Sequence, residues 1–133
     1  MNKKFSTKWN SSTQPRKQRK FRHNAPMHIK GKFLTVHLSP ELRKKYGTRS
    51  IRIRKGDTVK IMSGLHKTKT GKVQIVSVKR LKVYVEGIDV ARKEGNRKLV
   101  ALEPSNIMIT DLYLDDKKRI AKLESNKPKE KSD

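Results

Sequence analysis

Residues 54–78 read RKGDTVKIMSGLHKTKTGKVQIVSV and decide the fold. Apolar and polar residues alternate on both sides of a loop bounded by glycines, which is typical of two short β-strands joined as a hairpin. On the first strand Val59 and Ile61 share a face, and Gly64 ends the run. Because such a hairpin needs further strands to bury its apolar face, the strands around it must complete a sheet.

The second strand of this hairpin changes phase along its length. Gly71 opens it, and Val73 and Ile75 continue the apolar face. After Ile75 the apolar positions move to Val76 and Val78. A change of phase within one strand predicts a β-bulge at that point.

Three more short runs have strand character, namely 81–85, 98–102 and 107–110. Of the 18 Ile and Val residues, 15 fall within residues 51–110, where a pleated surface would accommodate them. Five short strands in sixty residues predict a mainly β fold built on a small antiparallel barrel, which leaves no exposed sheet edge. We expect a core that includes Val59, Ile61, Val73, Val83 and Val85.

Two helices are predicted outside the strands. Ser39 can cap a helix with Pro40 in its first position, and Gly47 can end it, so a short helix is expected near 40–46. Asp115 or Asp116 can cap a second helix that carries Ile120 and Leu123 on one face. Residues 127–133 are expected to be disordered.

The composition of the 133-residue chain indicates a polyanionic partner. It has 35 Lys and Arg against 12 Asp and Glu, a net charge of +23 that so small a protein cannot neutralise internally. There is no Cys and no apolar run long enough to span a bilayer. We therefore expect a cytosolic protein without a disulfide framework, a thiolate metal site or a membrane contact.

Charge divides the chain into three parts. Residues 1–50 carry a net +13, residues 51–110 carry +9 and residues 111–133 carry +1. We interpret them as a basic extension with a short helix, a β-barrel, and a C-terminal helix with a tail. Within the extension, residues 1–28 hold eight cations and no acid, so we expect them to be mobile until they bind a partner.

The strongest local signal is the basic arm at residues 14–26, QPRKQRKFRHNAP. Its arginines can bind phosphate through two hydrogen bonds, and Phe21 could stack on an unpaired base. Pro15 and Pro26 are expected to keep the segment extended rather than helical. A localisation signal, or charge that serves only solubility, is the alternative interpretation.

The loop at residues 64–72, GLHKTKTGK, superficially resembles a phosphate-binding P-loop. A P-loop needs four residues between its glycines and a hydroxyl residue after the lysine, whereas this loop has six residues and Val73. We expect a basic hairpin tip instead, with Lys67, Lys69 and Lys72 projecting to an RNA phosphate. A solvated surface loop is the alternative.

Catalysis and cofactors are not indicated. His23, His28, His37 and His66 lack zinc-site spacing and acidic partners, so no metal is expected. The acids are scattered, and Asp57 is expected only to fix the turn before its strand. We therefore predict that the protein is not an enzyme, needs no cofactor and binds no small-molecule substrate.

Residues 54–73 resemble a KOW motif, the glycine-centred hairpin of ribosomal and transcription proteins. The flanking blocks resemble one family in order, the universal large-subunit ribosomal proteins number twenty-four in their archaeal and eukaryotic form, with the archaeal type preferred. The resemblance spans about residues 14–124. The blocks are QPRKQRKFR (14–22), NAPMH (24–28), HLSPELRKKYG (37–47), YVEG (84–87) and PSNIMIT (104–110).

The resemblance implies an SH3-like barrel and binding to the 5′ region of the large-subunit ribosomal RNA. It also implies a place near the polypeptide exit, an early role in assembly, neighbouring ribosomal proteins as partners and no homo-oligomer. Turns are expected at Gly56, Gly64 and Gly71. RNA contacts are expected at Arg16, Lys17, Arg19, Lys20, Phe21, Arg22, His23, Lys30, Lys32, Arg43, Lys44, Arg49, Arg52, Arg54, Lys55, His66, Lys67, Lys69, Lys72, Lys79 and Arg80.

Two features depart from the family pattern. Lys67-Thr68 stands where the family often has Lys-Gly, and Glu103 stands where it often has His, so Glu103 is not expected to contact RNA. The main alternative function is an SH3-like chromatin protein that coats duplex DNA, but such a barrel needs no 50-residue extension. A transcription elongation factor would also need a polymerase-binding domain, for which the chain has no room.

Overall fold

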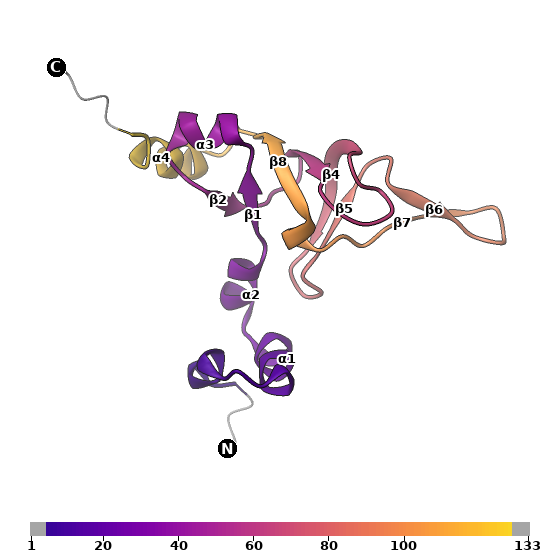
Figure 1. The fold of residues 1–133 in the computed structure, drawn as a ribbon, viewed down its shortest axis with the longest axis horizontal. Helices are drawn as coiled ribbons and strands as arrows, with labels where there is room; N and C mark the ends of the chain where they lie inside the picture. Colours follow the sequence, from indigo (N-terminus) through magenta and orange to yellow (C-terminus); the bar gives the residue numbers. More distant parts are fainter. Residues whose placement is uncertain (1–4, 129–133) are drawn as a thin grey trace.

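A computed structural model describes residues 5–128 of the chain. Figure 1 shows an N-terminal arm of helices leading into a body built on a sheet, with a thin hairpin projecting from one side of it. The elements are η1 (Thr7–Ser11), α1 (Pro15–Asn24), α2 (Met27–Phe33), β1 (Thr35–Leu38), α3 (Pro40–Tyr46), β2 (Ser50–Arg52), β3 (Thr58–Ile61), β4 (Thr70–Ser77), β5 (Lys82–Val85), β6 (Asp89–Ala91), β7 (Arg97–Leu99), η2 (Pro104–Asn106), β8 (Ile107–Asp111) and α4 (Lys117–Ser125).

The main sheet has six strands in the order β2-β1-β8-β3-β4-β5. β1 runs parallel to β8, so the prediction of a purely antiparallel sheet is wrong at this pair. The chain can make the parallel pair because β1 lies far from β8 in sequence and α3 and the other strands intervene. With four α-helices beside its strands, the described part of the chain is mixed rather than only mainly β.

The core follows the predicted alternation of the strands. All five expected residues are buried, and Val59, Val83 and Val85 are fully so. The same cluster also contains residues from outside 51–110, namely Leu34, Val36, Leu38, Tyr46 and Leu123. The folded core therefore extends beyond the segment in which the sequence placed the barrel.

The predicted irregularity in β4 is present, although its position differs by two residues. The register between β4 and β5 shifts between Val73 and Ile75. Ile75 is consequently turned outward and is 49% exposed, so its expected place on the apolar face is wrong. The bulge moves Val76 toward the core, against which it packs.

Two of the three predicted turn glycines are confirmed, because Gly56 and Gly64 have φ values of +97° and +93°. The prediction of a turn at Gly71 is wrong, since this residue lies inside β4. Its lack of a side chain serves close packing instead. A Cβ atom there would stand 2.6 Å from the carbonyl oxygen of Glu86.

Both predicted helices of the body are confirmed. In α3 the Ser39 hydroxyl accepts from the backbone N–H of Leu42, and Gly47 ends the helix in the left-handed conformation. In α4 the carboxylate of Asp116 accepts from the backbone N–H of Lys118. Leu123 of α4 is buried in the core. The predicted disorder of residues 127–133 falls largely on residues 129–133, which lie outside the described residues.

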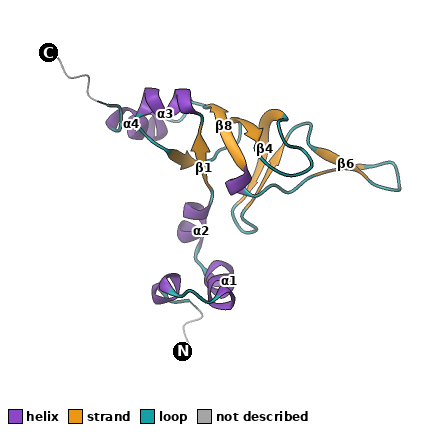
Figure 2. Cartoon of the chain, viewed as in Figure 1, coloured by secondary structure: helices purple, strands orange, loops and turns teal. Residues whose placement is uncertain are grey.

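The extended arm predicted for residues 14–26 is wrong, because α1 spans most of it. Figure 2 shows helices along the described arm up to β1. Pro15 stands in the first turn of α1, where a helix does not use the N–H that proline lacks. Pro26 falls between α1 and α2, where it is the N-cap residue of α2.

Phe21 of α1 is buried rather than free to stack on a base. Its ring lies 5.1 Å from the ring of Phe5 and 5.9 Å from that of Phe33, measured between centroids. These three rings form a small apolar cluster of the arm, separate from the core of the body. The proposed base-stacking role of Phe21 is therefore wrong in this structure.

Candidate nucleic-acid interface

A groove of about 670 Å³ lies between the arm and the turn that joins β4 to β5. Arg19, Arg22 and His23 of α1 share one helical face at a spacing of three to four residues, and this face lines the groove. The sheet contributes the tip of the β4–β5 hairpin. We call this hollow the arm groove, and its lining is Arg19, Arg22, His23, Lys30, Lys79, Arg80, Leu81, Lys82 and Glu103.

The arm groove is basic because little of its charge is compensated from within. Glu103 is its one carboxylate, and this side chain forms an ion pair with Lys82. Within residues 5–128, no carboxylate forms an ion pair with Arg19, Arg22 or Arg80. Cations gathered in a concave surface raise the local potential and attract polyanions.

Lys30 connects the two sides of the arm groove. It lies in α2 and is only 9% exposed, and its ammonium group donates to the carbonyl oxygen of Lys79 at 3.5 Å. A buried charge with a polar partner acts first as a structural contact. Lys30 therefore holds the arm against the hairpin, and its neighbours present the exposed charge.

The β3–β4 loop forms a separate basic tip. Lys67 and Lys69 are exposed, and the ammonium group of Lys69 lies 3.4 Å from Nδ1 of His66. The loop is held by backbone bonds, one of them from the N–H of Thr68 to the carbonyl of Ile61 at 2.9 Å. Thr68 has a φ of +75°, which is uncommon for a β-branched residue.

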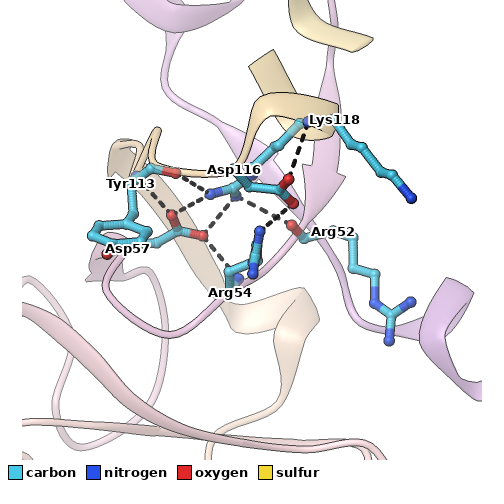
Figure 3. Close-up of polar contacts among 7 residues, drawn as sticks. Arg52, Arg54, Asp57, Tyr113, Asp116 and Lys118 are labelled. Carbon is cyan, nitrogen blue, oxygen red and sulfur yellow. Dashed lines mark hydrogen bonds and ion pairs between the residues drawn. The ribbon is translucent and has the colours of Figure 1, made fainter. Parts of the chain in front are cut away.

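A buried ion pair joins the turn before β3 to α4 (Figure 3). The two terminal nitrogens of Arg119 donate to the two carboxylate oxygens of Asp57, each at 2.7 Å. The carboxylate also accepts from the backbone N–H groups of Arg54 and Tyr113, each at 2.9 Å. The predicted turn role of Asp57 is confirmed by the Arg54 contact, but sequence analysis did not predict the ion pair.

Arg119 makes two further contacts that fix the surrounding backbone. It donates to the carbonyl oxygens of Tyr113 at 2.9 Å and Arg52 at 3.2 Å. Figure 3 shows the side chain of Arg52 extending away from this cluster, so its charge stays available at the surface. A hydrogen bond to the carboxylate of Asp115 raises the pKa of Tyr113 above its ordinary value of 10.0.

Two further hollows lie beside α4. One of about 490 Å³ is lined by Ile51, Arg52, Ile53, Arg54, Lys55, Val76, Val78, Asp116, Arg119 and Lys122. The other, of about 270 Å³, is lined by His28, Gly31, Lys32, Thr35, Ser50, Ile51, Arg52 and Lys122. Four of the predicted RNA contacts therefore meet here, namely Lys32, Arg52, Arg54 and Lys55.

The remaining predicted contacts do not join these hollows. Arg16, Lys17 and Lys20 are exposed on α1, and Lys20 lies over the Trp9 ring at 4.7 Å. Arg43 and Lys44 lie on α3, where Arg43 lies 3.4 Å from the His37 ring. Arg49 precedes β2, and Lys72 lies in β4, both exposed.

Sequence analysis missed three groups of cations. Arg92, Lys93, Arg97 and Lys98 lie on the β6–β7 hairpin, which projects from the body in Figure 2. Two basic pairs around a Gly95-Asn96 turn are the signal that could have revealed it. Lys82 and Lys122 line the hollows but stand alone in the sequence, so no local pattern marks them.

Other kinds of site are absent from the part of the chain that the structure describes. No cluster of three or more His, Asp or Glu is arranged to hold a metal ion between residues 5 and 128. Over the same span, no helix combines the length and the apolar character that crossing a bilayer requires.

Comparison with known proteins gives the family. The family described as "Ribosomal proteins L26 eukaryotic, L24p archaeal" matches residues 12–126. Large ribosomal subunit protein uL24 of Methanocella arvoryzae is 54% identical over 86% of this chain and 92% of its own length. The uL24 proteins of Methanocorpusculum labreanum and Methanospirillum hungatei are 52% and 48% identical, over 86% and 84% of this chain and 94% and 93% of their own lengths. The chain therefore belongs to this archaeal and eukaryotic family of large-subunit ribosomal proteins, which are structural constituents of the ribosome and not enzymes.

Proposed function

We propose that this protein binds the 5′ region of the large-subunit ribosomal RNA and that the arm groove is a principal contact. The observation that carries the proposal is the convergence of α1 and the β4–β5 turn, two distant segments, on one basic hollow. Family membership supports a place in the large subunit. Early action in assembly, a position near the polypeptide exit and location in the cytoplasm are further parts of the proposal.

The mechanism is electrostatic and architectural. Lys and Arg side chains neutralise phosphates and release the counterions condensed on the RNA, which drives binding without reading sequence. The arm groove offers guanidinium groups from α1 and the ammonium group of Lys79 on opposite walls. An RNA backbone lying between these walls would be fixed in shape, and neighbouring RNA helices could then approach each other.

Other elements of the proposal concern partners and architecture. The protein contacts neighbouring ribosomal proteins, acts as a single copy and needs neither membrane nor small molecule. The sheet curls into the SH3-like barrel of the family, and the basic extension, barrel and C-terminal part act as three functional regions. The exposed loop cations Lys67 and Lys69 provide a second point of RNA contact.

The first test is the salt dependence of binding to an RNA fragment from this 5′ region. About eight phosphate contacts predict a slope of log K against log salt of about −6 to −7. A duplex DNA of equal length serves as the competitor and should bind more weakly. A slope shallower than about −3 would refute the electrostatic mechanism.

The second test separates the arm groove from general charge. Arg19 lines the groove and Lys17 does not, yet both are exposed cations of α1. We expect Arg19→Glu to weaken RNA binding by at least about ten-fold more than Lys17→Glu, although each changes the net charge equally. Equal losses would mean that the groove has no special role.

A chain that begins at His28 tests the arm as a whole. Its melting temperature should stay nearly unchanged, because every residue of the main core lies beyond residue 33. Its RNA affinity should fall strongly and its salt slope should flatten. Full RNA affinity in the truncated chain would reduce the arm to solubilising charge.

A further inference from the structure

The two hollows beside α4 form one continuous surface. They share Ile51, Arg52 and Lys122. The surface therefore runs from α2 across β2 to α4, and we call it the α4 surface. None of the residues that line the arm groove lines either of these hollows.

The charge of the α4 surface favours an anionic ligand. Asp116 is the one carboxylate in the lining, and it forms an ion pair with Arg54. Arg52, Lys55 and Lys122 form no ion pair with a carboxylate within residues 5–128. Arg119 adds a buried Nε–H group that has no acceptor among the described residues.

Arg52 is positioned from two sides. Its carbonyl oxygen accepts from Arg119, as described above. Its guanidinium group packs against α2, because a Cβ atom on Gly31 would lie 2.6 Å from the central carbon of that group. A guanidinium held in one place loses less freedom when it binds phosphate than a mobile one does.

Lys122 reaches the surface because the buried ion pair places α4. It stands three residues after Arg119, so the two side chains lie on the same side of the helix. Arg119 points into the body to meet Asp57, and Lys122 remains exposed at the rim. The pair thus determines where the lysine lies.

We infer that the α4 surface is a second RNA contact, in which Arg52 and Lys122 bind phosphates of a backbone segment other than the one in the arm groove. The inference rests on the proposed function, because it takes RNA as the polyanion. An acidic segment of a neighbouring protein would match the same charges. RNA is favoured because the arm groove already presents the same chemistry on the same molecule.

The test compares Lys122→Glu with Lys117→Glu in the full chain. Both lysines are exposed on α4 and change the net charge equally, but Lys117 lines neither hollow. Filter binding should show Lys122→Glu weakening RNA affinity at least about ten-fold more than the control, with a salt slope shallower by about one. Hydroxyl-radical footprinting should show lost protection at nucleotides other than those lost in Arg19→Glu.

Three results would overturn the inference. Equal affinities of the two α4 variants would remove the phosphate contact while leaving the proposed function in place. Binding of a polyglutamate peptide that needs Lys122, with unchanged RNA affinity, would assign the surface to a protein partner. Failure of the unaltered protein to bind RNA would remove both proposals. If Lys122→Glu lowered the melting temperature, Arg52→Gln, which changes an exposed side chain, is judged by the same criterion.

Discussion

Replacing Arg119 by methionine should be among the most destabilising single changes in this protein. Asp57 is fully buried, and its carboxylate takes two of its four hydrogen bonds from Arg119. Methionine would fill much of the volume but leave a buried carboxylate with only two backbone N–H donors. Removing one partner of a buried ion pair costs about 3 to 5 kcal/mol of unfolding free energy.

The expected loss is large compared with the total. A domain of this size is stable by about 5 to 15 kcal/mol, so the variant should keep only part of its margin. Thermal denaturation followed by circular dichroism should show a melting temperature lower by about 10 to 20 °C. Hydrogen exchange should show the largest loss of protection in α4, because that helix loses its anchor.

A matched control is available on the β6–β7 hairpin. Arg97 pairs with Asp89 at 3.1 Å, but its side chain is 72% exposed. Arg97→Met should therefore cost less than about 1 kcal/mol. A loss below about 1 kcal/mol for Arg119→Met as well would refute the reasoning, because the buried pair would then contribute no more than a surface pair.

Three further changes test the packing of the sheet and its loops. Val73→Asp places a charge at a position that is 2% exposed, and the several kcal/mol that this costs should leave the chain largely unfolded by circular dichroism. Thr68→Gly relieves a left-handed backbone and should raise the urea midpoint, by about 1 kcal/mol of stability, so a lowered midpoint would contradict that account. Gly71→Ala forces a Cβ atom toward the Glu86 carbonyl and should cost about 1 to 3 kcal/mol in the same assay; an unchanged midpoint would show that the strands can separate freely.

The parts of the fold that sequence predicted are those with local causes. The α3 helix carries its own start and stop residues, Ser39, Pro40 and Gly47, and all three act as predicted. The alternation in β3 and β5 likewise depends on neighbours two positions apart. By contrast, the pairing of β1 with β8 joins segments about seventy residues apart, and no pattern within either segment specifies it.

The arm shows how a correct rule can be applied to the wrong position. Proline does break a helix from within, and this led to the prediction of an extended segment. At Pro15 the residue instead opens α1, where its fixed φ is suited to a helix. The buried contact of Phe21 with Phe5 and Phe33 was also hidden, because residues 5 and 33 lie far from it in sequence.

The candidate site was predictable in composition but not in arrangement. Charge alone identified Arg19, Arg22, Lys79 and Arg80 as candidates. Their meeting in one groove depends on how α1 lies against the β4–β5 turn, which only the folded chain determines. The same holds for Lys122, which is an ordinary surface lysine in the sequence and gains a candidate role only from the position of α4.

The placement of the acids separates the forces that fold this protein from those proposed to bind RNA. Four carboxylates form ion pairs within the described residues, at Asp57, Asp89, Glu103 and Asp116, and all four come from beyond residue 56. The first forty residues contain no acid at all. Internal pairing therefore stabilises the body, whereas the cations of the arm have no carboxylate near them in sequence. Because the two sets of charges barely overlap, changes to arm cations should alter RNA affinity and its salt dependence without altering the stability of the core.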